Sequence, residues 1–241
     1  LIVGDFRNVT RIDFETGATV WRVNRTCSVS SSCGAARSDE AIYIADSAVG
    51  GHVIKRLNML TGAIEYQSTV MGGVTLQNKP MVGPDGKIFL SRTQNNPTVD
   101  FFFAFEDAGG AINELWNEAA GWTTTSEFCV GPDGSVYMIG PGLTIQRRNG
   151  ATGALIDESA PVAADFLSPR MAADADGRIF FSNGSFDDGR FYSFDADLTA
   201  RWDVPVRNVN IGAPASGRGG TLIVCGIRTD VRAYRTDRCR V

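Results

Sequence analysis

The chain has a single imidazole, His52 in the segment GGHVIK, that could act as a general base or as a metal ligand. A triad base needs a nucleophile beside it, and the sequence lacks the G-x-S-x-G segment that presents a nucleophilic serine. The pattern therefore favours a structural role. We interpret His52 as a strand-edge residue that directly follows a Gly-Gly turn.

Two aspartates, Asp174 and Asp176, precede Gly177 in the order that begins a calcium-binding loop. Such a loop continues with further acidic ligands and closes with a glutamate, whereas Arg-Ile-Phe-Phe follows here. We therefore predict a hairpin turn at this segment. No catalytic residue and no metal ligand is assigned from the sequence.

Polar loops supply the candidates for ligand binding. Asp187 and Asp188 in SNGSFDDGR could hold a cation such as calcium, or sugar hydroxyls, although a solvated loop has the same composition. Trp122 in AAGWTTTSE could stack on a sugar ring or anchor a partner peptide, and packing inside the fold is the alternative. The predicted ligand-binding residues are Asn95, Asn96, Trp122, Asn183, Asp187 and Asp188.

Five cysteines are present, an odd number. Cys27 and Cys33 flank a serine-rich loop and could close a small disulfide ring, since a metal site would need further ligands nearby. Cys225 and Cys239 form a second, weaker candidate pair, which leaves Cys129 over. A disulfide would agree with a secreted or periplasmic location.

Composition narrows the class of protein. The 241 residues include 43% hydrophobic residues, 27 glycines and 9 prolines, which is typical of a domain with a sizeable core and many turns. A net charge of −4 gives no electrostatic reason to expect nucleic acid. No apolar run approaches the ~18 residues of a membrane span, and no signal-peptide pattern is visible. Because the chain opens at Leu1 inside an apolar run, we expect a processed or truncated N-terminus.

An octet recurs along the chain. VGPDGKIF at 82–89 and VGPDGSVY at 130–137 lie 48 positions apart, and ADADGRIF at 173–180 follows 43 positions later. Each copy places a two-residue turn before an alternating β-branched and aromatic run, which predicts a hairpin with a type I′-like turn. Looser copies occupy 38–43 and 216–223.

A second motif alternates with the first. Asp13-Phe14-Glu15-Thr16-Gly17 precedes Trp21, and the pattern returns at 58–66 and 149–157. Looser copies run from Glu106 to Gly110 and from Asp195 to Leu198. Each copy predicts the end of one strand, a turn and an outer strand. That outer strand at 111–120 competes with a helix, because AINELWNEAA contains good helix formers.

Both motifs together define a unit of four strands in roughly 45 residues, the period of a β-propeller blade. We predict an all-β fold, a single β-propeller domain over 1–241 with six four-stranded blades, while five or seven also fit the spacing. The first blade lacks its innermost strand, and the inner strands of the others are expected near Cys33, Lys79, Glu127, Ser168 and Gly212.

The pattern D-x-x-T-G-x-x-x-W, which stands as DFETGATVW at 13–21, resembles the tryptophan-docking repeat of quinoprotein-like β-propellers. That family includes dehydrogenases that use pyrroloquinoline quinone and non-catalytic relatives, such as the scaffold lipoprotein of outer-membrane protein assembly. The dehydrogenases have more blades, a calcium site and, in several, adjacent cysteines beside the quinone. This sequence has no Cys-Cys pair, so the resemblance implies a non-catalytic member without a quinone.

Function is expected at the loops between second and third strands, because these vary most between repeats. They are 46–51, 93–98, 141–142, 183–189 and 228–230. The sequence favours an extracytoplasmic scaffold that binds a protein or glycan at one rim. A metal-dependent hydrolase or lyase with its site at the channel mouth, and a carbohydrate-binding lectin, are the alternatives.

Overall fold

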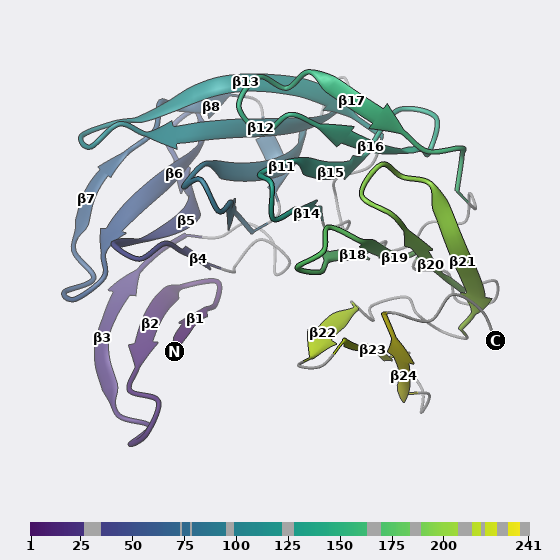
Figure 1. Cartoon of the computed structure of the whole chain (residues 1–241). Helices are drawn as coiled ribbons and strands as arrows, with labels where there is room; N and C mark the ends of the chain where they lie inside the picture. Colours follow the sequence, from purple (N-terminus) through teal and green to yellow (C-terminus); the bar gives the residue numbers. More distant parts are fainter. Residues whose placement is uncertain are drawn as a thin grey trace. The chain divides into compact units, whose positions relative to one another are not determined.

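The computed structural model describes residues 1–26, 35–72, 74–77, 79–94, 99–121, 128–162, 170–183, 189–206, 214–217, 220–225 and 231–236. Every regular element in these ranges is a β-strand (Figure 1). None of the described segments is therefore a long apolar helix of the kind that crosses a membrane. The chain forms two compact units, the first being Leu1–Ala119 with Ala151–Gly153 and the second Ala120–Gly150 with Ala154–Val241.

The first unit contains three antiparallel sheets. Sheet A consists of β1 (Ile2–Gly4), β2 (Asn8–Ile12) and β3 (Thr19–Asn24). Sheet B consists of β4 (Ala35–Arg37), β5 (Ala41–Ala48), β6 (Gly51–Asn58) and β7 (Ile64–Gln67), with β8 (Met71–Gly72) paired to β6. Sheet C consists of β10 (Met81–Val82), β11 (Ile88–Gln94), β12 (Val99–Asp107) and β13 (Ile112–Ala120), with β9 (Val74–Gln77) paired to β11.

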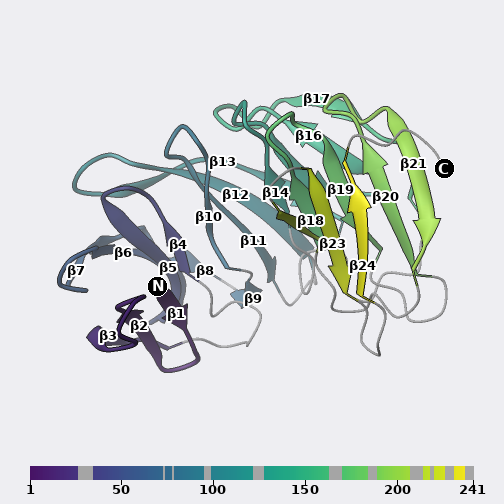
Figure 2. The ribbon, with the colours of Figure 1, turned by 60° about the horizontal axis from the view of Figure 1, so that its bottom comes forward.

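The second unit also contains three antiparallel sheets (Figure 2). Sheet D consists of β14 (Cys129–Val130), β15 (Val136–Ile139), β16 (Ile145–Arg148) and β17 (Leu155–Glu158). Sheet E consists of β18 (Arg170–Ala173), β19 (Ile179–Ser182), β20 (Arg190–Phe194) and β21 (Ala200–Pro205). Sheet F consists of β22 (Ala215–Gly217), β23 (Thr221–Cys225) and β24 (Val231–Arg235).

Within each sheet, strands that follow one another along the chain lie side by side, which is the meander of a propeller blade. The predicted unit of inner strand, hairpin, second strand, third strand, turn and outer strand is thereby confirmed. Segment 111–120 is strand β13 rather than a helix, as its place in the repeat indicates. In sheet A, β1 takes the position of a second strand, because β2 ends at the D-x-x-T-G turn that follows a third strand elsewhere.

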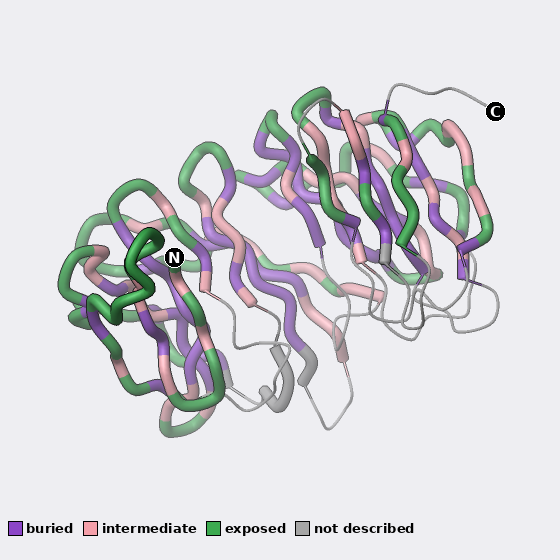
Figure 3. Tube along the Cα trace, turned by 90° about the horizontal axis from the view of Figure 1, so that it is seen from below, coloured by how far each residue is buried: buried purple, intermediate pink, exposed green. Residues whose placement is uncertain are grey.

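Burial follows the position of a strand in its sheet. The second strands β5, β15 and β19 are almost entirely buried, whereas β1, β23 and the outer strands β7 and β17 are more exposed (Figure 3). In β15 and β19 both sets of alternating side chains are buried, and most of them are apolar. One such cluster joins Tyr43 and Ile54 of sheet B to Leu90 and Phe105 of sheet C.

The octet turns differ from the predicted type I′ geometry. Gly86 N donates to Gly83 O at 3.0 Å, and Gly83 N donates to Lys87 O at 2.8 Å. Among the described non-glycine residues only Leu143 and Leu198 have positive φ, so Asp85 cannot occupy a type I′ position. The loop is a type I-like turn with Pro84 first, followed by a left-handed Gly86 (φ 80°), because the proline ring fixes a negative φ.

The D-x-x-T-G turns are held by their first side chain. Asp13 Oδ1 accepts hydrogen bonds from Glu15 N at 3.1 Å and Thr16 N at 2.8 Å, while Asp13 N donates to Ala18 O. Asn58 holds the corresponding turn in sheet B through the same side-chain oxygen. These contacts are Asx turns, which explains why Asp or Asn opens each copy.

One looser copy of the motif needs correction. In the segment 106–110 the residue with positive φ is Gly109 (φ 76°), whereas the spacing had indicated Gly110. The reason is a shorter turn, in which Ala108 N donates directly to Ala111 O at 2.9 Å. The predicted loop at 46–51 is shorter as well, because β5 continues through Ala48 and only Val49 and Gly50 form the turn.

Aromatic rings of one sheet dock on turn glycines of the next sheet. A Cβ atom on Gly62 would lie 2.7 Å from the Trp21 ring, so the indole rests directly on that glycine. Trp21 Nε1 also donates to Met59 O at 3.2 Å in the same turn. Trp116 rests in the same way on Gly153, where a Cβ would lie 2.8 Å from the ring.

Gly62 and Gly17 form a matched pair for testing this contact, because both have positive φ but only Gly62 faces a ring. Gly17→Ala should lower the free energy of unfolding by about 1 kcal/mol, the cost of a left-handed alanine. Gly62→Ala adds a clash with Trp21, and the loss should reach about 3 kcal/mol. Urea denaturation followed by circular dichroism measures both, and equal losses would contradict the docking role.

Candidate functional site

Most of the predicted ligand-binding residues, namely Asn95, Asn96, Trp122, Asp187 and Asp188, lie outside the described residues. The cysteines of the predicted disulfide, Cys27 and Cys33, lie outside them too. Asn183 follows β19 and is fully buried, and its Oδ1 accepts a hydrogen bond from Arg190 N at 2.9 Å. This side chain closes the β19–β20 hairpin, and the binding role of the set stays a prediction.

His52 is not at a strand edge. It lies in β6 between two partners, opposite Ser47 of β5 and Met71 of β8, and it is buried. Burial lowers the pKa of the imidazole, and the nearby charge of Arg92 lowers it further. The ring is therefore neutral at physiological pH and belongs to the interior of sheet B.

Asp174 and Asp176 form the predicted hairpin turn rather than a calcium loop. Asp174 Oδ1 accepts hydrogen bonds from Asp176 N at 3.0 Å and Arg178 N at 2.9 Å. Arg178 pairs with both carboxylates. Within the described ranges, no three His, Cys, Asp or Glu side chains gather as they would around a metal ion.

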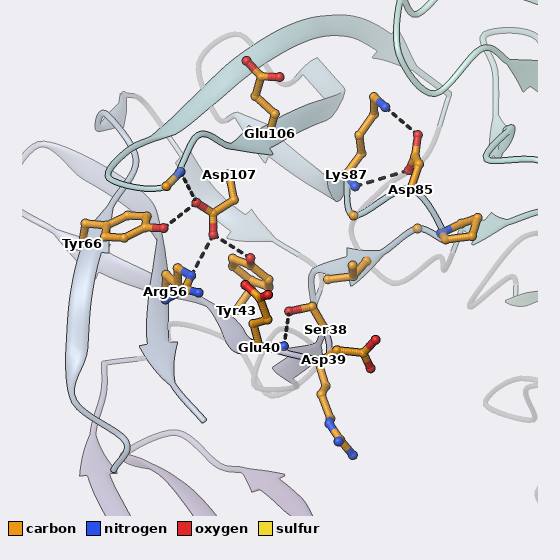
Figure 4. A pocket seen from close by; sticks show the side chains of 16 residues that line it. Ser38, Asp39, Glu40, Tyr43, Arg56, Tyr66, Asp85, Lys87, Glu106 and Asp107 are labelled. Carbon is orange, nitrogen blue, oxygen red and sulfur yellow. Dashed lines mark hydrogen bonds and ion pairs between the residues drawn. The ribbon is translucent and has the colours of Figure 1, made fainter. Parts of the chain in front are cut away.

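A cleft of ≈ 910 Å³ opens in the first unit between sheets B and C (Figure 4). Its walls are the β4–β5 turn at 38–40 and the β10–β11 turn at 83–87, and residues from β5, β6, β7 and the end of β12 complete it. These turns lie at the end of the sheets opposite to the loops between second and third strands. The cleft is therefore not at the rim that the sequence predicts.

Asp107, at the end of β12, is the centre of a hydrogen-bonded network in the cleft (Figure 4). Its Oδ2 accepts a hydrogen bond from Tyr43 Oη at 2.7 Å, and its Oδ1 accepts one from Tyr66 Oη at 2.5 Å. Arg56 Nε forms an ion pair with Oδ2 at 2.8 Å, and Gly109 N donates to Oδ1 at 3.0 Å. Residues of three different strands of sheet B, together with Gly109 of the β12–β13 turn, thus converge on one carboxylate of sheet C.

These contacts fix the protonation states. Burial alone would raise the pKa of Asp107, yet the hydrogen bonds from Tyr66 and Tyr43 hold it below the ordinary aspartate value. Burial and the hydrogen bond to Asp107 raise the pKa of Tyr66 to about 12. The pKa of Tyr43 is raised by the same two causes. At neutral pH the cleft therefore contains an ionised carboxylate with two neutral phenols.

The cleft lies where one junction between sheets departs from the repeat. Tyr66 occupies the position of Trp21, four residues after the turn glycine, and it meets Asp107 instead of a glycine. The turn that it meets spans 108–111, two residues shorter than the turn closed by Asp13 N and Ala18 O. A smaller ring and a shorter turn thus replace the close contact that Trp21 makes with Gly62, and the cleft lies at this junction.

Sequence reasoning missed the four side chains of this network, which are those of Tyr43, Arg56, Tyr66 and Asp107. Tyr43 and Asp107 are separated by 64 positions, and no motif contains them both. The sequence signal that could have found them is the loss of motif residues. The segment 106–110 lacks the threonine of the T-G turn, and the segment 58–66 ends in tyrosine rather than tryptophan. Adjacent repeats that both lose a docking element mark a junction where other contacts must replace it.

The chain matches no protein-family model, and no curated protein matches it. Solved structures do resemble it. BamB from Moraxella catarrhalis is 14% identical with a TM-score of 0.67, over 97% of this chain and 69% of that one. Quinohemoprotein alcohol dehydrogenase from Comamonas testosteroni is 10% identical with a TM-score of 0.68, over 98% of this chain and 56% of that one.

Hydrazine synthase from Kuenenia stuttgartiensis is 12% identical with a TM-score of 0.64, over 90% of this chain and 67% of that one. Likenesses at such identities show the fold alone. The fold is that of the β-propellers built from repeats of the quinoprotein type, which confirms the resemblance carried by DFETGATVW. The chain spans little more than half of the dehydrogenase.

Asp107→Asn should lower the free energy of unfolding by about 2 kcal/mol at neutral pH, because it removes the charge that Tyr43, Tyr66 and Arg56 contact, while Arg56 keeps its ion pair with Glu65. The pKa of Asp107 is lowered on folding, so its contribution is full above the ordinary value of 3.8 and is lost as the pH falls through the folded-state pKa. Urea denaturation at neutral and acidic pH should therefore show a difference from the wild type that shrinks in acid.

Glu106→Gln is the matched control for this experiment, since Glu106 is the exposed neighbour and loses the same charge. Its effect should stay within about 0.5 kcal/mol at either pH. A difference between Asp107→Asn and the wild type that is constant with pH would show that the carboxylate charge is not what stabilises this junction.

Proposed function

We propose that this protein is a non-catalytic scaffold that binds a partner protein. The observation that carries the proposal is the cleft between sheets B and C, where the hydrogen-bonded network around Asp107 lies beside exposed acidic side chains. Clefts that combine fixed polar groups with aromatic rings are typical binding sites. The likeness to BamB agrees with a scaffold, although it shows the fold alone.

The protonation states favour binding over catalysis at this cleft. A general acid or base works best when its pKa lies near the operating pH. Here the pKa of Asp107 is lowered and the pKa of Tyr66 is raised. Both pKa values therefore lie far from neutral pH, the first below it and the second above it. Their hydrogen bonds hold the wall in one geometry, which suits recognition and requires no cofactor.

The same proposal includes the architecture of the whole chain. We interpret the six sheets as six blades of one propeller domain over 1–241, of which the first contributes its second, third and outer strands. The predicted loops between second and third strands would then form a second binding rim, with Asn95, Asn96, Asp187 and Asp188 among its contacts. An extracytoplasmic location is part of this proposal and is supported by the resemblance to quinoprotein-like propellers.

Site-specific photo-crosslinking tests the proposal. p-Benzoylphenylalanine replaces Glu106 at the cleft, Asn95 and Asp187 at the second rim, or Glu15 as an exposed control in sheet A. Each variant is expressed in the organism that encodes the protein and irradiated there. We expect a discrete adduct with one second protein from the cleft position, and none from Glu15.

Mass spectrometry of the adduct identifies the partner. If neither the cleft position nor the second-rim positions give an adduct, the scaffold proposal is contradicted. Binding of the purified protein to a glycan array would then favour the lectin. An adduct from Asn95 or Asp187 alone would support the scaffold proposal, but it would place the partner contact at the second rim rather than at the cleft.

A further inference from the structure

The cleft between sheets B and C carries an excess of negative charge. Five acidic residues and three basic residues line it, so the formal net charge of its lining is −2. The basic residues are Arg37, Arg56 and Lys87. Two of these are already neutralised, because Arg56 pairs with Asp107 at 2.8 Å and Lys87 pairs with Asp85 at 2.5 Å. An anionic ligand would therefore find little free positive charge here.

The remaining carboxylates of the cleft are Asp39, Glu40 and Glu106. All three are exposed, and none makes an ion pair with any residue that the structure describes. They come from two sheets, since Asp39 and Glu40 lie in the β4–β5 turn and Glu106 lies in β12. Carboxylates on both sides of one opening can contact successive cationic groups of a single ligand.

The shape of the cleft suits a chain rather than a single ion. Its ≈ 910 Å³ exceeds the volume of one side chain, and the aromatic rings of Tyr43 and Tyr66 form part of its wall. Arg56 already lies over the Tyr66 ring, with its guanidinium carbon 5.4 Å from the ring centre. Aromatic rings next to carboxylates accept the aliphatic stem and the charged head of lysine or arginine together.

We propose that this cleft binds an extended segment of the partner protein that is rich in lysine and arginine. The inference rests on the proposed scaffold function and specifies the chemistry of its partner. The ligand's cationic heads contact Asp39, Glu40 and Glu106, and the Asp107 network provides a wall that does not rearrange. Opposite charge on the two surfaces also accelerates their association.

Fluorescence anisotropy with a labelled peptide, Ala-Lys-Ala-Arg-Ala-Lys-Ala, tests this inference on the purified chain. A peptide with glutamine at the three cationic positions is the ligand control. We expect binding of the cationic peptide only, and a Kd that rises with ionic strength because exposed charge pairs are screened.

The double variant Glu40→Gln, Glu106→Gln removes two cleft carboxylates without changing side-chain size. It should raise the Kd of the cationic peptide about tenfold, or about threefold for each lost pair. Glu15→Gln, Glu114→Gln removes the same charge from exposed positions of the first unit outside the cleft. That control should change the Kd by less than about twofold. Thermal melts of both variants confirm that the fold is retained.

Equal weakening by the two double variants would assign the binding to net charge and overturn the cleft as its site. Absence of binding by the cationic peptide would overturn the inference as well. Neither result touches the scaffold proposal, because photo-crosslinking from Glu106, Asn95 and Asp187 reports a protein partner of any charge. Failure of the crosslinks alone would overturn the scaffold while leaving a cation-binding cleft.

Discussion

The docking of an aromatic ring on a turn glycine of the next sheet is the constraint from which the rest of the structure follows. Trp21 lies so close to Gly62 that no Cβ atom fits between them. The turn must therefore be glycine with positive φ, and the Asx oxygen of Asn58 must hold that turn in register. Because β6 ends where this turn begins, the docking contact also sets the length of the third strand.

The junction between sheets B and C shows what happens when this contact is relaxed. Tyr66 contacts a carboxylate rather than a glycine, so a hydrogen bond to a charged group replaces the ring-on-glycine packing. Asp107 is half-buried and keeps its charge because several donors surround it, so each donor contributes to the stability of this junction. At the junction between sheets B and C the repeat thus exchanges a close-packed contact for a polar one, and the candidate binding cleft lies there.

The repeat could be predicted from the sequence because its signals are local. The octets and D-x-x-T-G segments each describe one turn and the strands beside it. Those turns formed where expected, except in the looser copy at 106–110, where the turn is shorter. The type of the octet turn was wrong because Pro84 outweighs the D-G pair that follows it. The cleft could not be predicted, since Tyr43, Tyr66 and Asp107 meet only after two sheets have packed. Only packing reveals such a contact.

The alternation of Asp13 and Asn58 at the same turn position has a consequence for the response to acid. Hydrogen bonds from the backbone and side chain of Thr16 lower the pKa of Asp13, so the Asx turn of sheet A loses its stabilising charge as the medium acidifies. Asn58 holds the equivalent turn of sheet B with an amide oxygen, which does not titrate. Two copies of one motif therefore differ in proton sensitivity, since acid weakens the Asx turn of sheet A and leaves the Asx contact of sheet B unchanged.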